Sequence, residues 1–421
     1  MQKIHNYNCY LLNILFALIP VTIILGNFAT NLNIFIFTVL AFIFFFSNKD
    51  KFEFNLNFFD KLILILFIYT FITLIINYLE KKFLHSSLDE IIIFKTILFQ
   101  RYLIIYFLIR VLLQKKILQL HWFVNVSAFC AAFVCLDVLF QFLFGKDFFG
   151  ITSPSLRHYS GPFGSELIAG GYIQKFGLFV LFFWKNLKKN SILKKNSIFI
   201  LLNIFILTSI VLSGNRMPLI LYLFSLFLYA YFDKNFNKYF KKIFLSALLI
   251  FFIVIQFNNN FKTHFKTFYT NGIELITTTL FEDFSDQSHV GYSKPYQVEF
   301  YCSKVFIKEN PFFGGGIRSY RTNLEGCGSH SHNYYFEILV DLGITGLIIV
   351  LFIIFFISKK INQLIKNQKA LPLNMMPFLL VLICEFFPVR SSGSFFSTNN
   401  SIVIFTFLAI LISQFLLKKN E

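Results

Sequence analysis

The chain has 421 residues, of which 56% are hydrophobic and only 14% are charged, and 63 of them are phenylalanine. This apolar content exceeds what one water-soluble core requires, which excludes a soluble enzyme. The net charge is +17, but the basic residues form short clusters between apolar runs instead of covering a polar domain, which argues against nucleic-acid binding.

Twelve apolar runs approach the length of about 20 residues that a helix needs to cross a bilayer. They predict an all-α, polytopic membrane helix bundle that forms one integral membrane domain. The first run lacks a small-residue cleavage site, so we interpret it as an uncleaved helix and not as a signal peptide. The runs lie at 9–27, 32–47, 60–79, 90–113, 121–144, 166–184, 197–213, 216–232, 242–257, 334–357, 374–388 and 399–417.

Lysines indicate the orientation of these spans. They concentrate in the connections that follow even-numbered spans, such as 185–195 after the sixth and 234–242 after the eighth. Because short cytoplasmic loops carry the Lys/Arg excess, the pattern predicts cytoplasmic N- and C-termini. Spans one to nine then occupy residues 1–257, and spans ten to twelve occupy 334–421. The long connection at 258–333 falls on the outer side.

The connection at 258–333 is polar but contains recurring Phe, Tyr and Ile, so we expect it to be ordered and functional. Apolar residues recur at helical spacing in Pro295–Glu309 and predict an amphipathic helix lying on the membrane surface. Asn310-Pro311 ends this pattern, and Gly314-Gly315-Gly316 then predicts a tight turn.

Arginine is rare in this lysine-rich chain, yet five of its seven arginines fall on the predicted outer side. The guanidinium group grips phosphate oxygens with two parallel hydrogen bonds, which favours a pyrophosphate site. The alternative is that each pairs with a carboxylate or a lipid headgroup. Arg101 and Lys175 lie within predicted spans, where structural pairing or a role in lining the site would explain them. The outer arginines are Arg157, Arg216, Arg318, Arg321 and Arg390.

The segment from Ser329 to Glu337 contains two histidines where the outer connection meets the next span. A histidine there can accept a proton from a hydroxyl near neutral pH. Asn333 is placed to cap the following helix, whose positive end would favour nearby anions. A metal site formed by Cys327, His330 and His332 is the alternative, but the spacing matches no standard zinc pattern.

Four motifs together resemble the O-antigen ligase and polymerase superfamily, a group of polytopic bacterial inner-membrane glycosyltransferases. The resemblance extends from about residue 150 to 400, and the first four spans add nothing to it. The motifs are Gly161-Pro162-Phe163-Gly164, Ser213-Gly214-Asn215-Arg216, Asn310-Pro311-Phe312-Phe313-Gly314-Gly315-Gly316, and His332-Asn333-Tyr334-Tyr335-Phe336-Glu337 with Leu342-Gly343-Ile344-Thr345-Gly346.

The resemblance implies transfer of a glycan from undecaprenyl pyrophosphate to an acceptor hydroxyl at the periplasmic face, without a cofactor or metal. Arg216 matches the outer-loop arginine of the family, and His332 matches its catalytic histidine. Arg157, Arg318 and Arg390 are assigned to the pyrophosphate from neighbouring motif residues, with Asn333 and His330 in support. Direct displacement with inversion at the anomeric carbon follows from this arrangement.

Lipid A–core sugar is the preferred acceptor, which makes the chain an O-antigen ligase. Polymerisation of O-antigen units and protein O-glycosylation remain open, because one sequence does not reveal the acceptor surface. A polysaccharide or lipid-linked oligosaccharide transporter is the rival from another class. The concentration of polar residues at one membrane face, instead of the midplane, counts against it.

The six cysteines include no Cys-x-x-Cys pair. Three fall inside predicted spans and Cys9 lies at the cytoplasmic start of the first, which leaves Cys302 and Cys327 in the outer connection. Because the periplasm is oxidising, we expect these two to form a disulfide that organises the segment before His332.

Overall fold

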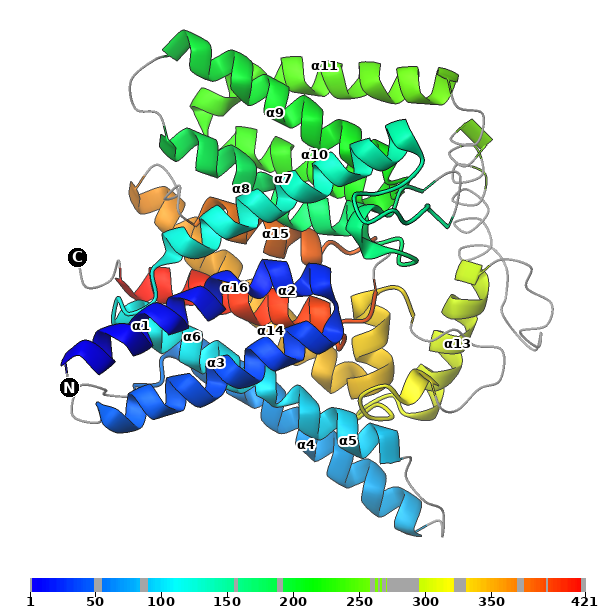
Figure 1. The fold of residues 1–421 in the computed structure, drawn as a ribbon. Helices are drawn as coiled ribbons and strands as arrows, with labels where there is room; N and C mark the ends of the chain where they lie inside the picture. The colour runs from blue at the N-terminus through cyan, green and yellow to red at the C-terminus, as the bar shows by residue number, and fades with distance from the viewer. Residues whose placement is uncertain are drawn as a thin grey trace. The chain divides into compact units, whose positions relative to one another are not determined.

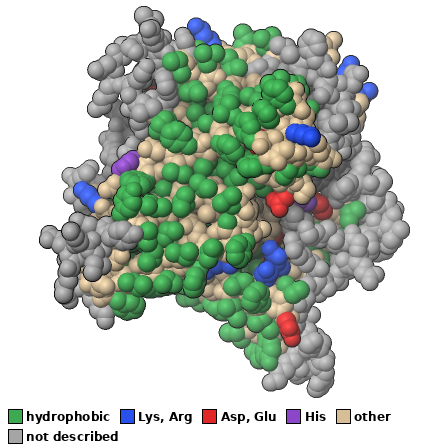
Figure 2. All heavy atoms as spheres, viewed as in Figure 1, with side chains coloured by type: hydrophobic (Ala, Val, Ile, Leu, Met, Phe, Trp, Pro, Cys, Tyr) green, Lys and Arg blue, Asp and Glu red, His purple; other side chains and the backbone are tan. Residues whose placement is uncertain are grey.

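The computed structural model describes residues 2–48, 55–83, 90–154, 158–187, 192–257, 262–263, 266, 270, 295–321, 331–368, 375–390 and 393–417. Within these ranges the chain is helical, with no β-strand beyond an isolated bridge between Lys146 and Thr152. The predicted all-α class is therefore confirmed. Hydrophobic side chains cover much of the described surface in the view of Figure 2, as expected for a protein in contact with lipid.

Six of the described helices are long and apolar enough to cross a membrane, and a bent pair at the N-terminus would make seven. The chain is therefore a multi-pass membrane protein. Each of the twelve apolar runs coincides with a helix or a broken helix. Five of the runs, in α8 to α11 and α15, are neither among the six helices nor in the bent pair. The six are Asn27–Ser47, Phe58–Glu80, Glu90–Gln114, Leu120–Phe144, Tyr334–Lys366 and Thr398–Leu417.

The described residues cluster into two compact units, each assembled from three stretches of the chain. The first unit comprises residues 1–48, 112–271 and 370–384, and the second comprises 49–111, 272–369 and 385–421. The first holds α1 (Gln2–Ala17), α2 (Ile19–Leu25), α3 (Asn27–Ser47), α7 (Leu120–Phe144), η2 (Gly161–Phe163), α8 (Ala169–Leu187), α9 (Ile192–Leu212), α10 (Arg216–Phe232), α11 (Lys234–Phe257) and most of α15 (Met376–Glu385). The second holds α4 (Phe58–Phe83), α5 (Glu90–Phe99), most of α6 (Arg101–Gln114), α13 (Pro295–Glu309), η4 (Ser319–Arg321), α14 (Tyr334–Gln368) and α16 (Thr398–Leu417).

In the first unit, α7 packs against α8, α9 and the N-terminal helices (Figure 1). The turn after α7 begins at Gly145, whose positive φ of 78° allows its N–H to bond the Gln141 carbonyl and end the helix. The Gln141 side chain in turn accepts a hydrogen bond from the Gly161 N–H at 2.9 Å. A Cβ at Gly161 would approach Val138 to 2.9 Å, so glycine allows η2 to lie directly against α7.

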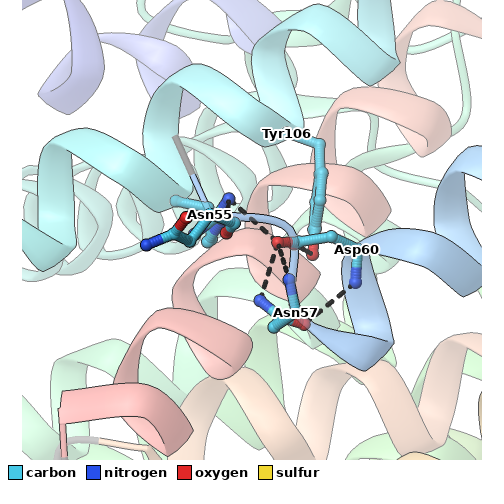
Figure 3. Close-up of polar contacts among 5 residues, drawn as sticks. Asn55, Asn57, Asp60 and Tyr106 are labelled. Carbon is cyan, nitrogen blue, oxygen red and sulfur yellow. Dashed lines mark hydrogen bonds and ion pairs between the residues drawn. The ribbon is translucent and has the colours of Figure 1, made fainter. Parts of the chain in front are cut away.

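In the second unit, α14 packs against α4, α13 and η4. The start of α4 is a reciprocal cap (Figure 3): the Asn57 side chain accepts a hydrogen bond from the Asp60 N–H, and Asp60 Oδ2 accepts one from the Asn57 N–H, both at 3.0 Å. Asp60 also accepts a hydrogen bond from the Tyr106 hydroxyl at 2.7 Å and forms an ion pair with Arg110 at 2.9 Å. Both charged side chains are almost fully buried. This cluster fixes α4 to α6.

Three predicted spans are interrupted, which the hydrophobic pattern does not reveal. The first bends by 50° between α1 and α2, where Pro20 near the start of α2 lacks a donor for the preceding turn. The fourth has a one-residue irregularity at Gln100, between α5 and α6, within a helix that is still continuous enough to count as one span. The tenth breaks at Gly343, whose backbone has φ 68° and ψ −173°.

The buried ion pair yields a stability prediction. Replacing Asp60 by Ala leaves the Arg110 charge buried without its carboxylate, and we expect a loss of about 3–5 kcal/mol in stability. The measurement is the fraction of protein that remains monodisperse in detergent after heating. Glu80→Ala, an exposed carboxylate on the same helix, is the matched control and should leave the midpoint unchanged.

The double variant Asp60→Leu/Arg110→Leu removes both charges together, so it should recover most of the stability lost in Asp60→Ala. Equal melting midpoints for Asp60→Ala and Glu80→Ala would contradict a stabilising role for the pair.

Candidate functional site

The start of α14 carries the histidine that the sequence singled out. Asn333 Oδ1 accepts hydrogen bonds from the backbone N–H groups of Tyr335 at 2.9 Å and Phe336 at 3.4 Å, which confirms the predicted helix cap. The Asn333 amide also donates to the Pro388 carbonyl at 2.8 Å. The cap is therefore anchored to the segment that precedes α16.

His332 immediately precedes this cap. Its φ of +48° is in the left-handed region, which turns the chain sharply into the helix. The side chain is 42% exposed, and its Nε2 lies 3.1 Å from Oε1 of Glu299 on α13. Nε2 therefore contacts the Glu299 carboxyl group, while the His332 side chain remains partly exposed at the surface.

Glu299 is the residue that sequence reasoning missed. It lies in the predicted helix Pro295–Glu309, which the structure confirms as α13 with the same bounds. Burial raises the pKa of the Glu299 carboxyl to about 8, and Oε2 has no hydrogen-bond partner among the residues that the structure describes. The sequence did contain a sign of this role: Glu299 lies three residues before Cys302, on the face of the amphipathic helix that is expected to be buried.

The backbone of Glu299 is held from two sides. Its carbonyl accepts hydrogen bonds from the Ser303 hydroxyl at 2.7 Å and the Tyr320 hydroxyl at 3.1 Å. Tyr320 packs with Cys302, Phe306 and Val340 in one buried cluster that joins α13, η4 and α14. Burial also raises the pKa of the Tyr320 phenol above its usual value.

Two glycines let the turn after α13 dock on the break in α14. A Cβ at Gly314 would lie 2.4 Å from the Leu342 backbone nitrogen, and one at Gly343 would lie 2.3 Å from the Phe312 carbonyl oxygen. Hydrogen bonds from the Gly315 N–H to the Val340 carbonyl and from the Ile344 N–H to the Pro311 carbonyl, both 2.9 Å, join the two segments. The predicted glycine turn is therefore confirmed. It packs against Leu342-Gly343-Ile344, in the motif that follows His332.

Arg318 follows the glycine turn. Its backbone has φ +70°, and its N–H donates to Asp341 Oδ2 at 2.8 Å, while Ser319 donates to Oδ1 at 3.1 Å. The buried Asp341 therefore fixes the backbone that presents Arg318, whose side chain is half-buried.

Arg390 is paired with a carboxylate, the alternative that the sequence left open. Its Nη1 lies 2.5 Å from Glu385 Oε1, and its guanidinium carbon lies 5.5 Å from the centre of the Tyr334 ring. The Tyr334 hydroxyl donates to the other Glu385 oxygen at 3.0 Å. Arg390 thus has a structural partner, and its assignment to pyrophosphate stays a prediction.

Arg216 belongs to the first unit, where it is the first residue of α10 and half-buried. The preceding Asn215 accepts a hydrogen bond from the Gly170 N–H and donates to the Leu167 carbonyl, both at 3.1 Å. A Cβ at Gly170 would lie 2.3 Å from Ser213 Oγ. The motif around Arg216 is thus docked on the start of α8, which sets the position of the arginine.

The other predicted residues have mixed outcomes. Arg157, Cys327 and His330 lie outside the described residues. Cys302 is buried and disulfide-bonded, and its pairing with Cys327 stays a prediction. Arg101 donates to Tyr102 at 2.7 Å and Thr398 at 3.3 Å, in agreement with the expected structural pairing.

No group of three or more metal-ligating side chains occurs among the residues that the structure describes. Lys175, on α8, is buried, as expected for a basic residue within a predicted span. Its role at the site stays a prediction.

Part of the chain matches a known protein family. Residues 200–351 match the model of the family described as O-antigen ligase. The match supports the resemblance to the O-antigen ligase superfamily. The matched segment includes Arg216, Glu299, Arg318 and His332, and it ends before Arg390. A search of curated protein sequences finds no match.

The family match supports a glycosyltransferase-like enzyme of the ligase or polymerase type. It also implies lipid-linked glycan and acceptor substrates in a membrane.

The interlocked glycines yield a second stability prediction. Gly314→Ala imposes a left-handed backbone on a residue with a Cβ and forces that Cβ against the backbone of α14, so we expect a loss of at least about 1–2 kcal/mol. The control is Gly171→Ala, where a Cβ meets no atom within 4 Å and the helical backbone suits alanine. Thermal midpoints of both purified variants decide the question: equal midpoints would show that the docking of the turn does not need glycine.

Proposed function

We propose that the chain is an O-antigen ligase that moves a glycan from undecaprenyl pyrophosphate to a hydroxyl of lipid A–core, at the periplasmic face of the bacterial inner membrane. The observation that carries the proposal is the half-exposed His332, held at the capped start of α14 within the segment that matches the family. An imidazole in this setting suits the removal of a proton from a sugar hydroxyl.

In the proposed reaction, the acceptor oxygen forms a bond to the anomeric carbon as the bond from that carbon to the pyrophosphate oxygen breaks. The electron pair leaves with undecaprenyl pyrophosphate, and the hydroxyl proton moves to His332. Arg216, Arg318 and Arg157 neutralise the charge that develops on the leaving group. Arg390 contributes less in this proposal, because Glu385 already offsets its charge. Attack opposite the leaving group inverts the anomeric configuration, and no metal takes part.

The proposed topology has twelve spans with both termini in the cytoplasm. Residues 258–333 then form a periplasmic connection, and His332 lies at its junction with the membrane. The lysine distribution between short connections supports this orientation. A helix or a broken helix lies at each of the twelve positions, and six of them, or seven with the bent N-terminal pair, are long and apolar enough to cross a membrane.

The lipopolysaccharide of a strain that lacks the gene for this protein tests which acceptor is used. Loss of long chains attached to lipopolysaccharide, with lipid-linked polymer retained, is the result expected for a ligase. Attached chains limited to a single repeat would indicate a polymerase of the same superfamily. Unchanged lipopolysaccharide would overturn both assignments. Transfer of labelled glycan by purified protein in detergent, where no gradient exists, separates either enzyme from a transporter.

Removal of His332 should stop transfer without loss of the fold. We expect His332→Ala to lower transfer by roughly 10²–10⁴-fold, as for the loss of a general base. Because His332 has a positive φ, His332→Asn is the better-matched variant: asparagine tolerates that backbone and lacks the basic ring. His121→Ala, at an exposed position on α7, is the control. Turnover within a few fold of the wild type in both His332 variants would place the base elsewhere.

Substitution of Arg216 distinguishes phosphate binding from a general need for positive charge. Arg216→Lys keeps the charge but loses the planar fork, so its loss of transfer should be nearly as severe as that of Arg216→Ala. Initial rates with purified protein and labelled donor provide the measurement, with thermal midpoints as the check on folding. Full activity in Arg216→Lys would show that charge alone is required.

A further inference from the structure

Glu299 and His332 form a carboxylate–imidazole pair that bridges two segments of the chain. The pair joins α13 to the residue before the cap of α14, with 3.1 Å between Oε1 and Nε2. Glu299 is buried, whereas His332 is 42% exposed. The carboxylate therefore approaches the ring from the protein side.

A neutral imidazole carries its proton on only one of its two nitrogens. A carboxylate that accepts a hydrogen bond from Nε2–H keeps the proton there and leaves the lone pair on Nδ1. The same carboxylate stabilises the imidazolium that forms when Nδ1 takes a second proton. The bonded nitrogen thus determines which nitrogen can act as a base.

We propose that Glu299 is the positioning residue of the transfer reaction: it holds His332 with the proton on Nε2, so that Nδ1 accepts the proton of the acceptor hydroxyl. The inference rests on the proposed function of His332. After the glycosyl bond has formed, the imidazolium releases its extra proton to water and the pair returns to its initial state.

The surroundings of Glu299 fit this role. Hydrogen bonds from Ser303 and Tyr320 to its carbonyl oxygen hold the backbone, and the packing of Phe300 on the Phe336 ring, with centroids 5.4 Å apart, connects the same two segments. Oε2 has no hydrogen-bond partner, so the contact with His332 is the carboxylate's polar contact among the described residues. Burying a carboxylate with one unpaired oxygen costs free energy, so a contribution to stability does not explain why an acid occupies this position.

The pair also sets an expected pH dependence. Two described titratable groups contact Glu299: His332 lies 3.1 Å from its carboxylate, and the Tyr320 hydroxyl donates to its carbonyl oxygen. The helix α14, which packs on α13, also carries the buried acids Glu337 and Asp341. Burial raises the pKa of Glu299 to about 8, so the carboxyl is protonated below that pH. A protonated carboxyl donates to Nε2 and shifts the ring proton to Nδ1, which removes the base. Transfer should therefore increase as pH rises through about 8.

The test compares Glu299→Gln with the wild type in purified, detergent-solubilised protein with labelled lipid-linked donor. Glutamine has nearly the same shape but neither titrates nor stabilises the imidazolium. Above pH 8, where the wild-type carboxylate is ionised, we expect kcat to fall by roughly 10²–10⁴-fold with little change in KM. The acidic limb of the rate profile should move down from about 8 towards the ordinary histidine value of about 6.5. Glu309→Gln, at an exposed position on the same helix, is the control and should change neither quantity.

The outcomes are separable. Wild-type kcat and an unmoved limb in Glu299→Gln overturn the positioning role, and the assignment of His332 then depends on its own variants. A lower kcat with an unmoved limb and a lower thermal midpoint indicates a structural role and also overturns the inference. If Glu299→Gln does not fold, the wild-type profile decides, because a limb at or below about 6.5 excludes control by Glu299. Full activity in the His332 variants instead overturns the proposed function.

Discussion

The arrangement around the candidate site depends on the backbone groups that become unpaired where α14 breaks at Gly343. In an apolar environment each such group is costly unless another part of the protein binds it. The Tyr69 hydroxyl on α4 lies 3.0 Å from the Leu342 carbonyl oxygen and 3.3 Å from that of Phe312, and the Asn77 amide donates to the Gly314 carbonyl at 3.0 Å. One helix therefore satisfies both the break and the turn docked on it. The glycine turn is held against α14 as a result.

Buried carboxylates repeat this solution elsewhere in the second unit. Asp341 accepts hydrogen bonds from Arg318 N–H and Ser319, and Glu337 accepts one from the Phe395 N–H at 2.5 Å. Both acids thus hold irregular backbone against α14. Glu299 differs from them, because its side chain contacts a half-exposed histidine instead of backbone N–H groups. This contrast separates an acid suited to catalysis from acids that maintain the fold.

The two arginines assigned by different motifs are also in different settings. Arg216 begins a helix, so its charge adds to the positive end of α10 and favours an anion there. Arg390 is buried beside Glu385, which reduces its capacity to attract phosphate. Since both are outer arginines in the sequence, charge and predicted side of the membrane do not distinguish them. Their immediate partners do.

The sequence by itself determined the helical class, the positions of the helices, the bounds of α13 and the cap at Asn333, because hydrophobic runs, breakers and capping residues act over a few neighbouring positions. Its motifs also indicated the superfamily. Only the tertiary structure revealed the pair of Glu299 with His332, the ion pair of Arg390 with Glu385 and the docking of Gly314 on Gly343. These contacts join residues between 5 and 33 positions apart whose spacing follows no helical period. Which side chains meet there is decided by the folding of α13 and the glycine turn onto α14, which local sequence pattern does not encode.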